Sequence, residues 1–362
     1  MAPPQMAVPR TAGCRELEAA LDRNMENLRS FITRMPKAEI HLHLEGAIPI
    51  GTLYEFARRA GSRSGVRSID DLRARLAYTD FGHFIEMWTW KNTFIEGYDD
   101  FEVMAYEVLR SLAEENIRYV EAHYSPGDYH MQRLKTAGIT DSILAGAERA
   151  RADFGIRCQL IIDLVRDHGP DIGMIRLNEA TPYLGKGVIA VGIGGSEQQF
   201  PPGAYEEVYR EARARGFHVT AHAGEAAGPE SILEAVEKLD VERIGHGVRA
   251  HEDPEVVALL RARAIPLEMC VISNVRTGVV RSVAEHPIRS YYDDGLVVTV
   301  NSDDPVMFNT TLTDEYLALA GPLGFSLDEI KQVALNGLRT SFLDPEEKHR
   351  LLSEFEAEME TL

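Results

Sequence analysis

The chain has 362 residues, 44% of them hydrophobic, which is enough for one large domain or two ordinary ones. With 57 acidic against 38 basic residues, its net charge of −19 repels phosphate backbones and anionic membrane surfaces, so nucleic acid and lipid are poor candidate partners. Cys14, Cys158 and Cys270 lie far apart without a Cys-x-x-Cys motif, which argues against a disulfide framework and against a cysteine zinc site.

The N-terminal residues lack the charged start, apolar run and cleavage site of a signal peptide. No uninterrupted apolar run approaches the roughly 20 residues of a membrane helix, so we expect a cytoplasmic globular protein. Residues 1–12, which begin Pro-rich, are predicted to be disordered. An amphipathic helix is predicted over 15–33, where aliphatic residues recur at helical spacing before Pro36.

The stretch 40–46 (IHLHLEG) alternates aliphatic and polar side chains, which is the period of a β-strand. On such a strand His41, His43 and Glu45 would project from one face, and two imidazoles held in this way can bind one metal ion. An isolated His-x-His is more often part of an ordinary half-buried strand, because short motifs also occur by chance. Matching ligands further along the chain would favour the metal site.

An aromatic-rich segment at 81–94 contains both tryptophans of the chain and predicts a helical insertion after the first strand. Aromatic helices of this kind usually pack in a core. The alternative is a lid over a flat, apolar ligand.

From residue 99 onward, apolar strands alternate with helices. The predicted strands lie at 118–124, 157–165, 187–193, 218–223, 243–246, 265–270 and 296–300. With the stretch 40–46 they number eight, and their alternation with helices implies a parallel sheet buried on both faces. Eight such units indicate a closed (β/α)8 barrel, an α/β fold. Two extra helices are expected after Ser326, and because no linker or repeat is visible we expect one domain over 1–362.

In a barrel of this kind the active site lies at the carboxyl ends of the strands, and the chemically capable side chains follow those ends. They are His41, His43 and Glu45 after the first strand, His222 and Glu225 after the fifth, His246 after the sixth, and Asp303 and Asp304 after the eighth. Each one alone is more often a packing or capping residue. Their joint placement at one end of one barrel favours a functional cluster.

A metal bound by His41, His43, His222 and Asp303 would have three imidazole ligands and one carboxylate. Such a thiolate-free set suits Zn²⁺, with Fe²⁺ and Mn²⁺ as alternatives. Zn²⁺ would lower the pKa of a bound water towards ~7. Barrel hydrolases with two metals need a bridging ligand, often a lysine after the fourth strand, whereas residues 192–196 are GIGGS. We therefore expect one zinc ion per subunit.

Three further residues fit acid–base catalysis. Glu225 follows His222 by three residues, so a turn could bring its carboxyl to the water and the substrate, and burial should raise its pKa and let it donate a proton. His246 could orient the hydroxide or accept its proton. Asp304 could hydrogen-bond the substrate, although a simple turn before Pro305 explains an Asp-Pro pair equally well.

Together the motifs His-x-His-x-acid-Gly, His-Ala-Gly-Glu, Gly-His-Gly and Ser-Asp-Asp-Pro resemble the adenosine/adenine deaminase family of zinc-dependent barrel hydrolases. The resemblance extends from residue 36 to beyond residue 309. It implies that the three histidines and Asp303 named above hold zinc, and that Glu225 protonates purine N1 as hydroxide adds to C6. It also implies that His246 assists the attacking water, that Asp304 bonds N7 and that the backbone N–H of Gly195 bonds N3. Ammonia then leaves and the 6-oxopurine remains.

The departures from the family pattern concern the substrate. Adenosine deaminases usually carry Asp where this chain has Glu45. This position and His43 are associated with substrate binding, and the acidic residue with the ribose hydroxyl. A glutamate there is more like the free-adenine enzymes. The Gly-His-Gly at 245–247 resembles the nucleoside enzymes instead. Residues 194–197 (GGSE) match neither group, and residues 270–276 (CVISNVR) resemble the adenine and modified-nucleoside branches.

This mixed pattern predicts zinc-dependent hydrolytic deamination of a 6-aminopurine nucleoside, with adenine as one alternative. Aminodeoxyfutalosine, a menaquinone-pathway intermediate modified at its sugar end, is the other alternative. Its carboxylate could meet Arg249 or Arg276, although an ordinary surface or loop position is favoured for both arginines.

Three other classes of function are alternatives to this deaminase. A different mononuclear C–N hydrolase on this barrel would not need an acid at N1. A catalytically silent nucleoside-binding relative is disfavoured, because no ligand or acid–base position is missing. The nucleic-acid-editing zinc deaminases need a Pro-Cys-x-x-Cys motif that this chain lacks. The sequence leaves the oligomeric state open.

Overall fold

The computed structural model describes residues 26–79 and 81–362. The expected disorder over 1–12 and the first part of the predicted helix over 15–33 lie outside the described residues, whereas residues 26–34 are helical. Among the described residues no helix is long and apolar enough to cross a membrane.

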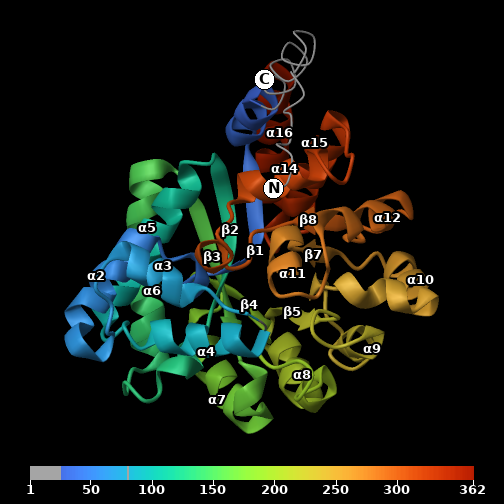
Figure 1. Ribbon diagram of the computed structural model, residues 1–362. Coiled ribbons are helices and arrows are strands. Elements are labelled where there is room, and N and C mark those ends of the chain that lie inside the picture. The colour runs from blue at the N-terminus through green and yellow to red at the C-terminus, as the bar shows by residue number, and fades with distance from the viewer. Residues whose placement is uncertain (1–25, 80) are drawn as a thin grey trace, which may run out of the picture.

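Eight parallel strands form the centre of the described chain, each paired with its neighbours in sequence order (Figure 1). They are β1 (Lys37–His43), β2 (Ile117–Tyr124), β3 (Arg157–Asp163), β4 (Val188–Gly192), β5 (His218–Ala223), β6 (Arg243–His246), β7 (Leu267–Met269) and β8 (Val298–Val300). The ring closes just after β8, where the Asp303 N–H donates to the His41 carbonyl (3.2 Å) and the His43 N–H donates to the Asp303 carbonyl (3.0 Å). The predicted (β/α)8 barrel is confirmed.

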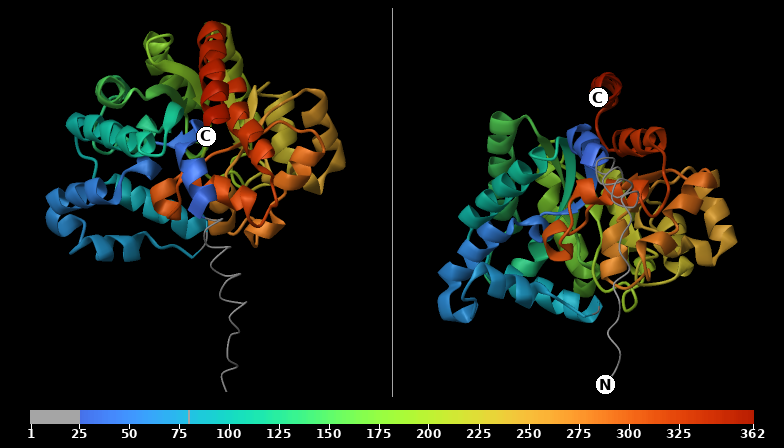
Figure 2. Two further views of the ribbon diagram at one scale, coloured as in Figure 1. Left: turned by 90° about the horizontal axis from the view of Figure 1, so that it is seen from above. Right: turned by 45° about the horizontal axis from the view of Figure 1, so that its top comes forward.

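Helices surround this barrel, and Figure 2 shows them from two further directions. They are α2 (Ile50–Ala60), α3 (Ile69–Leu76), α4 (Phe81–Asn92), α5 (Tyr98–Ala113), α6 (Thr136–Phe154), α7 (Pro170–Ala180), α8 (Glu206–Arg215), α9 (Pro229–Glu237), α10 (Pro254–Ala262), α11 (Val271–Arg276), α12 (Ile288–Asp293), α13 (Pro305–Phe308), α14 (Leu312–Ala320), α15 (Leu327–Arg339) and α16 (Pro345–Thr361). The two helices expected after Ser326 are α15 and α16, and α4 is the expected aromatic insertion.

Two features of the first half differ from the sequence prediction. The strand β1 ends at His43, so Glu45 lies in a 3-10 turn (Glu45–Ala47) and does not project beside the histidines. The chain leaves the strand at Leu44, which has helical backbone angles (φ −55°, ψ −42°). Residues 61–70 are polar and loop-like in sequence, but they contain the start of α3. Its first turn is capped by the Ser68 side chain, which accepts from the Asp71 N–H at 3.1 Å.

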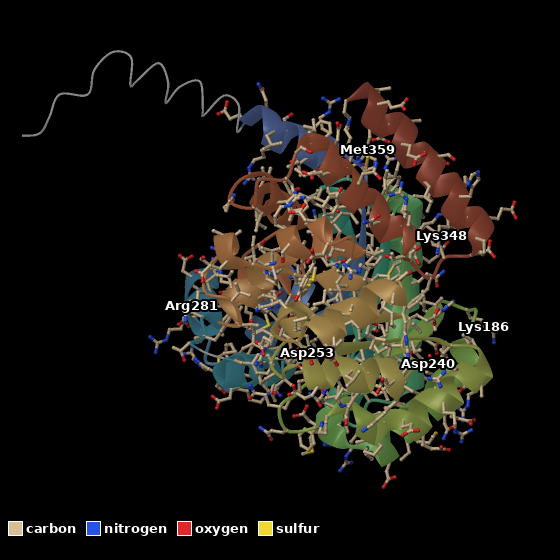
Figure 3. All side chains as sticks on the ribbon, turned by 90° about the vertical axis from the view of Figure 1, so that its right-hand side faces the viewer. Lys186, Asp240, Asp253, Arg281, Lys348 and Met359 are labelled. Carbon is tan, nitrogen blue, oxygen red and sulfur yellow. The ribbon has the colours of Figure 1, made fainter. Side chains whose placement is uncertain are left out.

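The interior of the barrel below the strand ends is charged. Arg243 is 1% exposed and pairs with Glu121 (2.6 Å) and Glu268 (2.5 Å), which are both fully buried. Lys186, Asp240 and Arg281 are, by contrast, exposed and point away from the ribbon (Figure 3). A buried arginine with two carboxylates is tolerated only because each charge is paired, and it provides a fixed polar base for the strand ends above it.

Candidate active site

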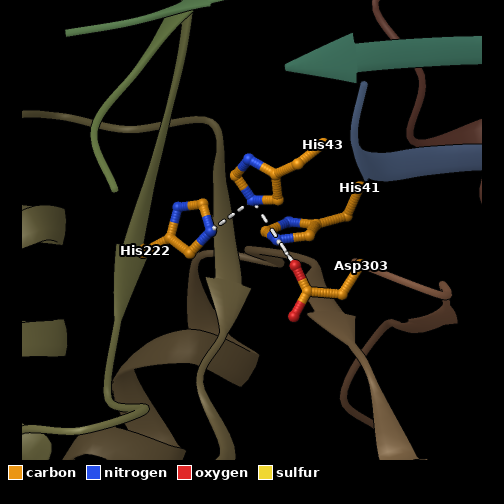
Figure 4. A group of neighbouring side chains, drawn as sticks. All are labelled: His41, His43, His222 and Asp303. Carbon is orange, nitrogen blue, oxygen red and sulfur yellow. Dashed lines mark hydrogen bonds and ion pairs between the residues drawn. The ribbon is translucent and has the colours of Figure 1, made fainter. Parts of the chain in front are cut away.

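The four predicted metal ligands converge at the carboxyl end of the barrel (Figure 4). His41 and His43 come from β1, His222 from β5 and Asp303 from the turn after β8. Nε2 of His43 lies 3.1 Å from Nε2 of His222 and 3.4 Å from Oδ1 of Asp303, and Nε2 of His41 lies 3.6 Å from that same oxygen. One donor atom from each of the four residues lies within 4.8 Å of the others.

The remaining ring nitrogens and the second carboxylate oxygen are held by neighbours. Nδ1 of His41 donates to Glu268 (2.7 Å), and Nδ1 of His222 donates to the Ile193 carbonyl (3.0 Å). The other oxygen of Asp303 accepts from the Ser273 hydroxyl at 2.7 Å. These bonds leave the Nε2 atoms facing the common centre, as in protein metal sites, where the outer hydrogen bonds orient the ligands.

The donor set fits a metal ion. Nε2 of His41 is buried and has no hydrogen-bond partner among the described residues, and such an orphan atom is costly unless something else satisfies it. Burial lowers the pKa of His43 to about 3, which keeps that ring neutral and able to coordinate. Burial alone would raise the pKa of Asp303, but His41 and the other imidazoles hold it below its usual range. Three imidazole nitrogens and one carboxylate match a mononuclear metal site.

Close approaches around the ligands require glycine at two positions. A Cβ on Gly245 would lie 2.7 Å from Cε1 of His41, and a Cβ on Gly46 would overlap the carboxyl of Asp304. His246 and Asp303 themselves have positive φ (61° and 62°), which non-glycine residues rarely adopt. Backbone strain of this kind is common at functional sites, where the surrounding structure fixes it.

Glu225, His246 and Asp304 lie around the same centre. Nε2 of His246 is 3.5 Å from Oε2 of Glu225 and 3.9 Å from Oδ2 of Asp303. Burial, with the charges of Asp303 and Glu197, raises the pKa of Glu225 well above its ordinary value. Burial and the charge of Asp303 likewise raise the pKa of Asp304 well above its ordinary value. Burial lowers the pKa of His246 to about 4, so the surroundings favour the protonated form of both carboxyls and a neutral imidazole.

The loop that carries Glu225 is fixed by a residue that the sequence analysis left without a role. The carboxylate of Glu197 accepts from the backbone N–H groups of Gly224 (2.6 Å), Glu225 (3.1 Å), Ala226 (2.7 Å) and Ala227 (2.9 Å). Four N–H groups turned towards one carboxylate form an anion-binding nest. The Glu of the GGSE motif was visible in the sequence, but nothing local indicates which loop it contacts.

A cavity of about 210 Å³ opens above the donor set. Its inner lining contains His43, His222, Glu225, His246, Asp303, Asp304 and Gly195. The Gly195 N–H donates to no described residue and is free for a ligand. The lining also includes Ser125, Asp128, Asp167 and His168 and side chains of α4. The aromatic insertion therefore forms one wall of the cavity, as the lid interpretation expects, and Trp88 is anchored there by its Nε1–H, which donates to Asp128 (3.2 Å).

Glu45 lies behind this wall rather than among the lining residues. Its Oε1 accepts from the Ser125 N–H (3.0 Å), and its Oε2 has no partner among the described residues. Beside it, Lys91 donates to the Glu45 carbonyl (2.7 Å) and lies 3.9 Å from the centre of a Trp88 ring. Burial raises the pKa of Glu45 to about 7.

The two arginines considered for a substrate carboxylate do not reach the cavity. Arg249 pairs with Glu252 at 2.7 Å, and Arg276 lines a separate surface hollow beside Tyr78 and Phe308. Neither residue is part of the cavity lining. This result agrees with the ordinary surface or loop positions that the sequence analysis favoured for both.

The barrel, the three-histidine and one-aspartate cluster and the acid–base side chains around it define a metal-dependent barrel hydrolase. A family model described as adenosine deaminase matches residues 36–358. The chain belongs to the adenosine deaminase family and is a hydrolase that acts on C–N bonds in cyclic amidines.

Three curated relatives are similar over most of their length. An adenine deaminase of Bordetella avium is 36% identical over 86% of this chain and 98% of its own. An aminodeoxyfutalosine deaminase of Streptomyces coelicolor is 33% identical (98% and 92%), and an adenosine deaminase of Clostridium kluyveri is 31% identical (91% and 96%).

Two solved structures have similar folds. An adenine deaminase from Arthrobacter aurescens has a TM-score of 0.84 at 30% identity, covering 89% of this chain and 98% of that one. An amidohydrolase from Burkholderia ambifaria with bound zinc has a TM-score of 0.85 at 26% identity, covering 99% and 95%.

Proposed function

We propose that this chain catalyses hydrolytic deamination of a 6-aminopurine nucleoside, giving the 6-oxopurine and ammonia, with one Zn²⁺ per subunit. The observation that carries the proposal is the convergence of a metal donor set and three acid–base side chains on one cavity. The curated relatives are named for adenosine, adenine and aminodeoxyfutalosine deamination, and these substrates share a 6-aminopurine ring. That common chemistry supports the same reaction here.

His41, His43, His222 and Asp303 would hold the metal. A set of three imidazoles and one carboxylate without thiolate suits Zn²⁺, and the zinc-bound Burkholderia ambifaria amidohydrolase of similar fold supports that choice. When bound, Zn²⁺ supplies Lewis acidity that brings the pKa of a coordinated water towards ~7. Metal analysis of the purified protein should give one zinc per chain.

Glu225 would act as the acid. Its raised pKa favours the protonated carboxyl, which can donate a proton to ring nitrogen N1 as a water oxygen adds to C6. Of the two protons of that water, one goes to the departing amino group and the other restores the carboxyl of Glu225. Addition at C6 moves electron density to N1, and a positioned acid there lowers the barrier, typically by 10²- to 10⁴-fold in rate. The C6–N bond then breaks, ammonia leaves and the 6-oxopurine remains.

The purine ring would be oriented by two donors. The raised pKa of Asp304 favours its protonated form, which can donate a hydrogen bond to N7, while the free N–H of Gly195 can donate to N3. Both ring nitrogens are acceptors, so a protonated carboxyl and a backbone N–H match them. His43, which lines the cavity and lies 5.9 Å from Trp88 between ring centres, would contact the ring face.

The cavity supports a nucleoside rather than free adenine, because its lining includes Ser125, Asp128, Asp167 and His168 in addition to the groups that read the ring. It also supports an uncharged sugar over the carboxylate of aminodeoxyfutalosine. Asp128, Asp163 and Asp167 line the cavity, whereas no lysine or arginine among the described residues does. Two like charges 4 Å apart repel by about 1 kcal/mol even in bulk water, and by more in a partly buried site.

Ultraviolet assays of the zinc-loaded protein on adenosine, deoxyadenosine, adenine, AMP and aminodeoxyfutalosine test the proposal. We expect the highest kcat/KM for an uncharged nucleoside and a loss of about tenfold or more for the anionic substrates. Turnover of none of these compounds would refute the deaminase assignment. A preference for aminodeoxyfutalosine would refute the choice of an uncharged sugar.

A further inference from the structure

A chain of hydrogen bonds runs from His246 to the backbone, and the reaction outlined above does not use it. Nδ1 of His246 lies 3.2 Å from Nδ2 of Asn274, and Oδ1 of Asn274 lies 3.1 Å from Nε2 of His286. The chain ends at Ile288, whose backbone N–H donates to Nδ1 of His286 at 3.2 Å. His246, Asn274 and His286 are all at least 97% buried.

The Ile288 N–H sets the direction of every bond in this chain, because a backbone amide can only donate. Nδ1 of His286 must therefore accept, and the neutral ring carries its proton on Nε2, which donates to Oδ1 of Asn274. The amide of Asn274 then turns its NH₂ group towards His246, whose Nδ1 accepts. Neutral His246 is left with its proton on Nε2.

The neutral state of His286 agrees with its surroundings, because burial lowers its pKa to about 3. A protonated His286 would have an N–H at Nδ1 facing the Ile288 N–H, and the chain would then contain two opposed donors. Each tautomer along the chain is therefore determined by its neighbour, starting from the backbone.

Nε2 of His246 points into the reaction centre, 3.5 Å from Glu225 and 3.9 Å from Asp303. We propose that Asn274 and His286 are positioning residues that hold His246 as its Nε2–H tautomer, so that it offers a hydrogen-bond donor to the water oxygen that adds to C6. The identity of that oxygen rests on the proposed function. Of the two roles considered for His246, orienting the water and accepting its proton, this tautomer performs the first.

The variant Asn274→Asp tests the chain of hydrogen bonds without changing the shape of the side chain. A carboxylate can only accept, so it draws the His246 proton to Nδ1 and leaves Nε2 as an acceptor. A wrong tautomer of a catalytic histidine is costly, and we expect kcat to fall about 100-fold or more, with KM changed by less than about threefold. His286→Gln should retain most of the activity, because a glutamine amide can still accept from Ile288 and donate to Asn274.

Asn336→Asp is the matched control. The Asn336 amide donates to the Val298 carbonyl (3.1 Å) beside β8 and does not touch His246, so kcat should stay within about threefold of the wild type. A general cost of replacing an asparagine amide beside the barrel strands by a carboxylate would lower the activity of both aspartate variants, although Asn336 is only partly buried. An effect on the tautomer of His246 lowers only that of Asn274→Asp.

Nuclear magnetic resonance of the metal-loaded full chain, labelled with ¹⁵N-histidine, reports the tautomer without reference to turnover. The His246 signals, assigned by their loss in His246→Gln, should show protonated Nε2 and bare Nδ1 in the wild type and the reverse in Asn274→Asp. Protonated Nδ1 in the wild type would overturn the inference, as would an Asn274→Asp variant of unchanged kcat. If that variant does not fold, the wild-type spectrum decides alone. A wild type that deaminates no aminopurine refutes the proposed function but leaves the tautomer result standing.

Discussion

Glu268→Gln should weaken metal binding although Glu268 touches no metal donor atom. Its carboxylate accepts from Nδ1 of His41 at 2.7 Å and from Arg243 at 2.5 Å, with all three side chains at most 1% exposed. The two carboxylates beside His41, on Glu268 and Asp303, outweigh the effect of burial and raise its pKa to about 10, which makes the imidazole a strong electron donor. Glutamine keeps the volume, but its single carbonyl oxygen cannot serve both partners equally well.

The loss expected from removing such an outer hydrogen-bond partner is 10- to 100-fold in metal affinity, about 1.4 to 2.7 kcal/mol. Because the pair is fully buried, we expect the upper half of this range. Competition with a chromophoric chelator at fixed pH measures the dissociation constant of the metal. Glu121→Gln is the control, because Glu121 pairs with the same Arg243 (2.6 Å) and contacts no ligand histidine. A metal affinity within about twofold of the wild type for Glu268→Gln, or an equal loss in both variants, would refute this reasoning.

Glu197→Gln should lower kcat about 100-fold with little change of KM. The backbone N–H groups of 224–227 lose the carboxylate that holds them, so Glu225 on that loop moves. Steady-state kinetics with unchanged kcat would contradict this. Gly46→Ala should reduce kcat/KM, because its Cβ overlaps Asp304, whereas Gly51→Ala, which has open space around it, should leave kcat/KM unchanged. Because the folded-state pKa of His286 is about 3 and its ordinary value is 6.5, the unfolded chain takes up the proton first as pH falls. The free energy of unfolding that this group contributes above pH 6.5 should therefore be lost as the pH falls towards 3, by at most about 1.4 kcal/mol per pH unit. In urea unfolding, the dependence of the free energy of unfolding on pH should be weaker for His286→Gln, by the equivalent of up to one proton.

Most of the fold could be predicted from local pattern. Parallel strands buried on both faces read as short apolar runs, and the helices between them have their own periodicity, so all eight strands were located to within a few residues. The placement of single turns could not be predicted in this way. Glu45 continues the alternation of β1 in sequence, but the chain bends at Leu44, which has helical backbone angles although its N–H still bonds the His123 carbonyl on the neighbouring strand (3.0 Å). The short helix α11 could not be predicted either, because its six residues are too few to show a helical period.

The sequence by itself determined which side chains meet. Parallel strands bring their carboxyl ends to one edge, so residues that follow β1, β5, β6 and β8 had to gather there wherever the helices lie. Only the tertiary structure decided the states of these side chains: which carboxyls are buried enough to stay protonated, which nitrogen of His246 carries the proton, and which loop Glu197 holds. Those properties depend on burial and on partners distant in the chain, such as His246, Asn274 and Ile288, and no local pattern encodes them.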